Sequence, residues 1–159
     1  MRMRGFAQCG GGKRLTRRKR GSMKSVKLAV LGLNQGAKIV RDALKHDEVE
    51  LVAVAGFGEQ AESVASELGL KRYEDYRLLL RQEDLDAIAI ALPNGLHVEA
   101  VEESLAAGIR NILLEKPIAN TIEEAQHIID ICKNTRAKLK TIPGIYEIID
   151  GKVNVTKIR

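Results

Sequence analysis

From residue 27 onwards, short apolar runs alternate with segments in which apolar residues recur every three or four positions. A short apolar run bounded by turn residues is typical of a buried strand, and the longer spacing is typical of one face of a helix. This alternation predicts an α/β fold, in which a doubly wound, mostly parallel, Rossmann-like sheet forms a single domain. The predicted strands are residues 27–31, 51–55, 70–73, 87–92, 111–114 and 138–142, and a predicted helix follows each of the first five.

Turn and capping residues support these boundaries. Gly32 ends the first apolar run, and Gly108 stands where the fourth predicted helix should stop. Thr121 and Glu124 have the spacing of a capping box, in which a hydroxyl and a carboxylate each bind an unpaired backbone N–H at a helix start. Cys132 falls on the apolar face of the helix that follows, which favours a small core residue over a reactive thiol.

The C-terminal residues predict a β-hairpin. Residues 143–144 are Pro-Gly and mark a turn, and the Asp-Gly pair at 150–151 favours a tight connection between residues 146–149 and 152–155. An exposed hairpin edge could pair with another copy of the chain, so a homodimer is one expected assembly.

Basic residues are concentrated at the N-terminus. Residues 1–23 carry eight Lys or Arg and no acid, so they supply +8 of charge and leave −3 for residues 24–159 out of a net +5. Residues 1–23 have too little apolar surface to offset the entropy lost on ordering, so they are predicted to be a disordered tail. A folded domain over residues 24–159 is predicted to follow. The alternatives for the tail are an arm that binds nucleic acid, an organelle presequence, or a leader before a natural start at Met23. The leader is favoured because basic clusters are weak motifs.

Composition narrows the class of protein. The chain has no Trp, two Phe and three Tyr, so it offers no row of stacking platforms for single-stranded nucleic acid, which is expected to bind only through the tail. Its two cysteines do not make a disulfide framework, which fits a reducing compartment and predicts a cytoplasmic location. No apolar run approaches the roughly 18 residues of a membrane span, and no cluster of metal ligands is predicted.

The turn after the first strand is a candidate phosphate-binding loop. A dinucleotide fold places G-x-G-x-x-G or G-x-G-x-x-A here, so that backbone N–H groups at the helix start face a pyrophosphate. Gly32 and Ala37 fit that pattern, whereas Asn34 stands where the second glycine is expected and Gly36 could shift the approach by two positions. The predicted ligand contacts are Gly32, Asn34, Gln35, Gly36 and Ala37.

The end of the second strand leaves the choice of cofactor open. An Asp or Glu there would bind the adenosine ribose of NAD, and an adjacent Arg would bind the 2′-phosphate of NADP. This chain has Gly56 at that position, followed by Phe57 and Gly58. Either NAD or NADP is therefore expected, without a preference between them.

Two polar segments follow the fourth and fifth predicted strands, at residues 91–97 and 115–117. Because the carboxyl ends of parallel strands form one rim, these segments are expected to build one site. Lys116 could donate to a substrate hydroxyl or exchange a proton, so it is the candidate catalytic residue. The candidate site residues on this rim are Pro93, Asn94, His97, Glu115, Lys116 and Pro117, and the family resemblance given next implies that they contact the cofactor.

These motifs resemble the Gfo/Idh/MocA family of oxidoreductases, over about residues 26–138 and thus over the nucleotide-binding half of that family. The resemblance implies that Asn94 and His97 lie beside the nicotinamide and its ribose, and that Lys116 reaches nicotinamide and substrate. It leaves the peptide bond between Lys116 and Pro117 open between cis and trans. The segments that carry the resemblance are residues 30–33, 91–97, 106–108, 114–118 and 121–125.

The C-terminal part departs from that family. Its substrate domain would begin just after residue 140, whereas residues 131–153 resemble the end of the Rossmann-like domain in CapD-type nucleotide-sugar dehydratases of polysaccharide synthesis. The expected function is therefore an NAD(P)-binding domain of a sugar-type oxidoreductase, incomplete as an enzyme. The alternative is a non-catalytic sensor that binds a nucleotide, a nucleotide sugar or coenzyme A and is linked to polysaccharide synthesis. A basic RNA-binding protein is a third reading, which depends on the tail alone.

Overall fold

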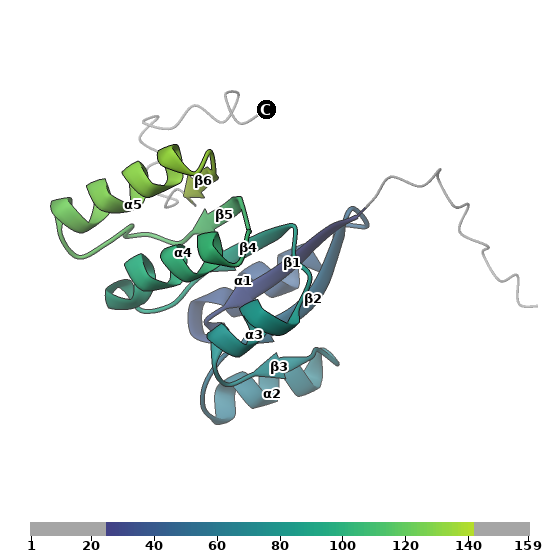
Figure 1. Ribbon diagram of the computed structural model, residues 1–159. Helices are drawn as coiled ribbons and strands as arrows, with labels where there is room; N and C mark the ends of the chain where they lie inside the picture. The colour runs from purple at the N-terminus through teal and green to yellow at the C-terminus, as the bar shows by residue number, and fades with distance from the viewer. Residues whose placement is uncertain (1–24, 142–159) are drawn as a thin grey trace, which may run out of the picture.

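The computed structural model describes residues 25–141, which form a parallel sheet between two layers of helices (Figure 1). The strands are β1 (Val26–Leu31), β2 (Val49–Ala55), β3 (Arg72–Tyr73), β4 (Ala87–Ile90), β5 (Asn111–Leu114) and β6 (Lys138–Thr141). The helices are α1 (Leu33–Ala43), α2 (Glu59–Glu67), α3 (Tyr76–Gln82), the short 3-10 helix η1 (Asn94–Leu96), α4 (His97–Ala106) and α5 (Ile122–Asn134).

The six strands lie in the order β3-β2-β1-β4-β5-β6, and every neighbouring pair is parallel. The chain therefore adds strands on one side of β1 and then crosses to add strands on the other, which places a topological switch point between β1 and β4. Open α/β sheets bind ligands at that point, beyond the carboxyl ends of the strands. The predicted fold class is confirmed. The predicted tail and C-terminal hairpin lie outside the described residues.

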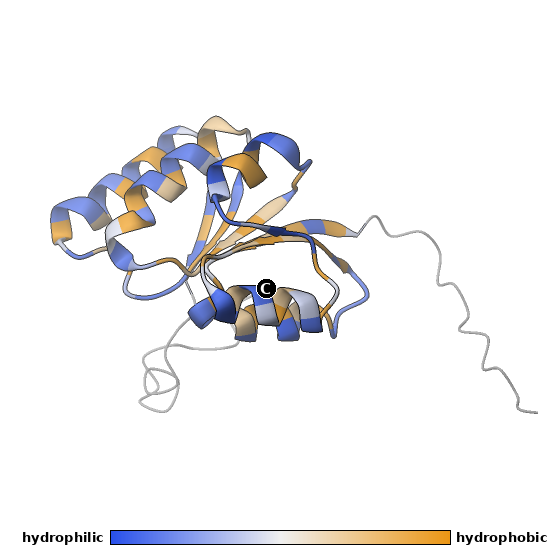
Figure 2. Ribbon diagram, turned by 90° about the horizontal axis from the view of Figure 1, so that it is seen from below, coloured by the Kyte–Doolittle hydropathy of each residue, from blue (hydrophilic) through white to orange (hydrophobic). Residues whose placement is uncertain are grey.

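Each face of the sheet is covered by a different set of helices (Figure 2). Val40 of α1 and Ala61 of α2 pack with Val30 and Val54 on one face. The other face carries α3, α4 and α5, and its core includes the buried side chains of Leu79, Val101, Leu105, Ile128 and Cys132. The structure therefore agrees with Cys132 as a core residue, and burial raises the pKa of its thiol.

The helix starts follow local side-chain chemistry. The hydroxyl of Thr121 accepts a hydrogen bond from the backbone N–H of Glu124 at 3.2 Å, as the capping box predicts. The Glu124 carboxylate returns to the backbone N–H of Asn120, at 3.0 Å, instead of that of Thr121. The predicted helix over 96–107 begins at His97, because residues Asn94–Leu96 form the tighter turn η1.

The turn between β1 and α1 lies very close to the end of β4. Gly32 has φ +89°, and a Cβ added to it would lie 2.2 Å from the backbone carbonyl oxygen of Ala91. A backbone atom at that distance cannot give way, so only glycine fits between these two strands. This contact brings the first turn and the loop after β4 to opposite sides of one cleft.

Replacing Gly32 by Ala should destabilise the fold by at least about 3 kcal/mol, since it adds both backbone strain and a clash with a carbonyl. Gly58 provides a matched control, because its φ of +87° is similar but no atom lies within 4 Å of its added Cβ. Gly58→Ala should therefore cost only the strain of positive φ, about 1–2 kcal/mol. Urea unfolding measures both free energies, and equal losses would contradict the proposed clash.

Candidate functional site

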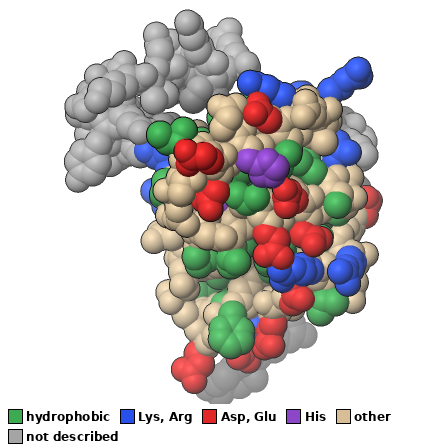
Figure 3. Space-filling model, turned by 60° about the vertical axis from the view of Figure 1, so that its left-hand side comes forward, with side chains coloured by type: hydrophobic (Ala, Val, Ile, Leu, Met, Phe, Trp, Pro, Cys, Tyr) green, Lys and Arg blue, Asp and Glu red, His purple; other side chains and the backbone are tan. Residues whose placement is uncertain are grey.

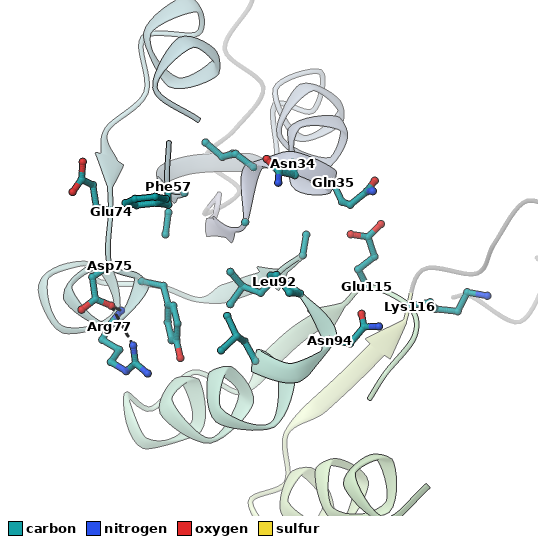
Figure 4. Close-up of a pocket in the computed structure, with 18 residues that line it drawn as sticks. Asn34, Gln35, Phe57, Glu74, Asp75, Arg77, Leu92, Asn94, Glu115 and Lys116 are labelled. Carbon is teal, nitrogen blue, oxygen red and sulfur yellow. Dashed lines mark hydrogen bonds and ion pairs between the residues drawn. The ribbon is translucent and has the colours of Figure 1, made fainter. Parts of the chain in front are cut away.

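A cleft of about 900 Å³ opens at the switch point, beyond the carboxyl ends of β1, β2, β4 and β5 (Figure 4). Its volume lies at the upper end of the range usual for small-molecule and cofactor sites. The described residues that line it are Gly32, Leu33, Asn34, Gln35, Ala55, Gly56, Phe57, Glu74, Asp75, Tyr76, Arg77, Ala91, Leu92, Pro93, Asn94, Leu96, Glu115 and Lys116.

The floor of the cleft contains the start of α1. Gly32 precedes this helix and makes no side-chain capping bond, and the first turn of α1 contains no acidic residue. By contrast, α2, α4 and α5 each carry Glu in the first turn, and Asp75 caps α3. The backbone N–H groups and positive dipole end of α1 are therefore not neutralised by its own side chains. Such a helix start suits an anionic group such as a pyrophosphate.

The predicted loop residues divide into two groups. Asn34 and Gln35 are exposed and line the cleft, together with Gly32. Gly36 and Ala37 are buried and lie outside the cleft lining, and a Cβ on Gly36 would approach Val30 Cγ1 to 2.8 Å. Gly36 therefore allows α1 to pack closely on β1. A phosphate in the cleft would not approach Gly36, because this residue lies outside the cleft lining.

The rim residues after β4 and β5 meet at one end of the cleft. Pro93, Asn94, Glu115 and Lys116 all line it. In Figure 4, the carboxylate of Glu115 points towards Gln35, whereas the Lys116 side chain extends outwards, away from Asn94. The structure thus places these two polar segments side by side, as the sequence predicts, and opposite the first turn. Pro117 is exposed outside the lining, and the bond from Lys116 to Pro117 is cis.

His97 does not reach the cleft. Its side chain is fully buried, its Nε2 lies 2.8 Å from the carbonyl oxygen of Leu92, and its Nδ1 lies 3.0 Å from that of Ile118. Leu92 belongs to the loop after β4 and Ile118 to the loop after β5, so the buried imidazole contacts both loops that carry the rim residues. The expected contact between His97 and a cofactor is therefore replaced by a structural one.

The end of the cleft opposite Lys116 was not predicted. In Figure 4, Phe57, Glu74, Asp75 and Arg77 lie together at that end, far from Asn94, Glu115 and Lys116. The Phe57 side chain is 84% exposed, which is unusual for a residue of that size. A lone aromatic residue between two glycines was the signal available in the sequence, but the other three residues depend on how β3 and α3 pack.

Ion pairs organise this second end. Arg77 pairs with Glu99 of α4 and lies 3.6 Å from Asp75, and its hydrogen bond to Glu99 raises the pKa of the guanidinium above its usual value. The guanidinium also lies 4.8 Å from the centre of the Tyr76 ring. The Tyr76 hydroxyl is buried and has no partner among residues 25–141, and burial raises the pKa of this phenol.

Among residues 25–141, no helix is long and apolar enough to cross a membrane, and no cluster of three metal-binding side chains occurs. The face drawn in Figure 3 carries several acidic side chains mixed with hydrophobic and basic ones. This mixture does not favour a nucleic-acid surface on that face, since phosphate binding needs a concentration of Lys and Arg.

Comparison with known sequences identifies the family of this chain. A profile described as "Oxidoreductase family, NAD-binding Rossmann fold" matches residues 26–141. D-xylose 1-dehydrogenase (NADP(+)) 2 from Haloferax volcanii is 37% identical over 106 residues, which cover 65% of this chain and 32% of that protein. 2,7-anhydro-N-acetylneuraminate hydratase from Mediterraneibacter gnavus is 31% identical over 112 residues, covering 70% of this chain and 29% of that one.

Solved structures match the fold over the same region. Scyllo-inositol dehydrogenase from Lactobacillus casei with bound NAD(H) and scyllo-inositol superposes with a TM-score of 0.66 at 28% identity, covering 74% of this chain and 36% of that one. The chain therefore spans about a third of the length of the relatives that it matches. None of these matches supports the expected CapD-type resemblance, and the family profile ends at residue 141.

His97→Phe should lower the free energy of unfolding by about 2 kcal/mol or more, because the phenyl ring fills the same space but has no N–H to donate to the carbonyl oxygen of Leu92 or Ile118. His127→Phe is the matched control. His127 is half-exposed on α5 and pairs with the exposed Glu102, so its loss should cost less than about 1 kcal/mol. Urea unfolding of both variants checks this, and similar losses would contradict the role assigned to His97.

Proposed function

This chain belongs to the Gfo/Idh/MocA family of oxidoreductases, and from that premise we propose that it binds NAD(P) in an extended form along the cleft. The adenosine lies at the Phe57 end, the pyrophosphate over the start of α1, and the nicotinamide at the Lys116 end. The observation that carries this proposal is the common cleft shared by Gly32, Asn94 and Lys116.

The residues present suit each part of this ligand. The start of α1 offers unneutralised N–H groups to the pyrophosphate. The exposed ring of Phe57 offers a flat apolar surface to a purine base. At the other end, Asn94 and Lys116 provide donors for an amide or a ribose hydroxyl. Phe57 thus offers an apolar contact where the base would lie, and Asn94 and Lys116 offer polar groups where a reaction would occur.

The bound nicotinamide would supply hydride transfer, and the chain's own residues would orient it and manage the proton. Asn94, held in η1, would fix the orientation of the nicotinamide end by hydrogen bonds. Lys116 would donate to a substrate hydroxyl or take up its proton, which requires the ammonium group to turn inwards from the position in Figure 4. Glu115 adds a carboxylate on the same rim, facing Gln35.

The proposed role of the chain is the cofactor-binding half of a sugar-type oxidoreductase. Several relatives are named for sugar or inositol substrates, and this chain covers about a third of their length. Hydride transfer needs a substrate held against the nicotinamide, and we assign to residues 25–141 the side of that site that holds the cofactor. A substrate-binding domain would have to provide the opposite wall.

A sensor domain for a nucleotide, a nucleotide sugar or coenzyme A is the second candidate, favoured by Asn34 in the position of the second loop glycine. Native mass spectrometry of the purified protein separates the two candidates by the mass of any retained ligand. A mass of NAD or NADP supports the oxidoreductase, and a mass of coenzyme A or a nucleotide sugar supports the sensor.

Phe57→Ala should weaken binding of NADH and of ADP-ribose by a similar factor, about five- to tenfold, since both ligands carry the adenine. Ile122→Ala is the control, because Ile122 is 83% exposed on α5, outside the cleft. Calorimetric titration measures both ligands. An unchanged affinity of the Phe57 variant would place the adenine elsewhere.

Lys116→Ala should instead weaken NADH more than ADP-ribose, because only NADH carries the nicotinamide. The exposed position predicts a change in unfolding free energy below about 0.5 kcal/mol. Loss of cooperative unfolding in this variant would show that Lys116 is structural, and an equal loss for the two ligands would reverse or displace the proposed orientation.

A further inference from the structure

The end of β2 cannot hold the acidic residue that a dinucleotide fold expects there. A Cβ on Gly56 would lie 2.8 Å from Ala61 Cβ and 3.1–3.2 Å from Leu33 Cγ and Cβ. The Ala61 methyl group is fixed to its backbone and cannot rotate away. Any side chain at position 56 would therefore push α2 from the sheet, so a carboxylate for the ribose must come from another element.

Glu74 lies beside Gly56 on the neighbouring strand. β2 and β3 run parallel with Ala55 opposite Tyr73, and the backbone N–H of Gly56 donates to the carbonyl of Tyr73 at 3.0 Å. The residue after Tyr73 therefore stands at the same edge of the sheet as Gly56. Glu74 lines the cleft with its side chain 70% exposed, and Figure 4 shows it next to Phe57.

Arg72 connects the Glu74 carboxylate to the end of β2. Its Nη1 donates to the carbonyl oxygen of Gly56 at 3.1 Å, and its Nη2 lies 3.5 Å from Glu74 Oε1. The Arg72 side chain is only 20% exposed, so the guanidinium is held in place between the two groups. This arrangement keeps the carboxylate close to Gly56, and the exposure of Glu74 leaves it accessible to a ligand.

We propose that Glu74 binds the adenosine ribose in this cleft and makes the site prefer NAD(H) to NADP(H). This inference rests on the proposed function. A carboxylate accepts hydrogen bonds from ribose hydroxyls, whereas a 2′-phosphate would bring about two negative charges towards Glu74 and Asp75. The nearby cations do not cancel this repulsion, because the two guanidinium groups of Arg72 and Arg77 face three carboxylates, those of Glu74, Asp75 and Glu99, which leaves a net negative charge.

Calorimetric titration of the full chain with NADH and NADPH tests the proposal. The unmodified protein should bind NADH at least about tenfold more tightly than NADPH, because like charges placed together oppose binding. Glu74→Gln should reduce this ratio to less than about threefold, mainly by strengthening NADPH binding. The ratio of the unmodified protein should also fall as salt is raised, which a purely structural role of Glu74 would not produce.

Two further variants separate charge from structure. Glu74→Asp keeps the negative charge and should keep the preference for NADH. Glu67→Gln removes a carboxylate of similar exposure, 61%, at the end of α2 and outside the cleft, so its ratio should equal that of the unmodified protein. Thermal unfolding of each variant establishes that the fold is retained.

The outcomes distinguish a failure of the role proposed for Glu74 from a failure of NAD(P) binding itself. If neither nucleotide binds at millimolar concentration, the proposed function is overturned, and the inference with it. If NADPH binds as tightly as NADH, or if Glu74→Gln leaves the ratio unchanged, the role of Glu74 is overturned while NAD(P) binding stands.

Discussion

The site depends on the close approach of the β1–α1 turn to the end of β4. Gly32 lies against the carbonyl of Ala91 at a distance that excludes any side chain. Because β1 and β4 are paired in parallel, this contact places the start of α1 opposite the loop that carries Asn94. A wider turn would move the helix dipole away from the loop and open the cleft to solvent on that side.

A second constraint joins the loops after β4 and β5. A neutral imidazole has one N–H, yet both ring nitrogens of His97 face carbonyl oxygens, of Leu92 and Ile118, within 3.0 Å. Only the doubly protonated ring donates to both, so the neutral ring leaves one carbonyl without its hydrogen bond. Either way, the ring spans the two loops and limits how far Asn94 and Lys116 can separate. Positioning of the polar rim is therefore a property of the buried interior as well as of the strands.

The elements that the sequence predicted were those set by local pattern. The apolar runs predicted where the strands lie, and the predicted strand 111–114 has the same bounds as β5. The capping residues located the start of α5. Where spatial neighbours decide, the sequence was insufficient. Gly36 was expected to allow a shifted approach of the phosphate but packs on Val30, and His97 belongs to a rim motif but is buried. The group around Phe57 could not be foreseen, because it depends on the pairing of β2 with the two-residue strand β3.

The Phe57 end of the cleft illustrates why motif positions and chemical roles can separate. A ribose requires a hydrogen-bond acceptor at a point in space, and parallel strands in register end at the same height. Close packing of α2 against β2 excludes a side chain at Gly56, but it leaves the end of β3 open. Arg72 contacts both the Gly56 carbonyl and Glu74, and so holds the Glu74 carboxylate close to the end of β2, where a dinucleotide fold expects an acidic residue. Packing at one strand end thus determines which strand can carry the charge that the ligand meets.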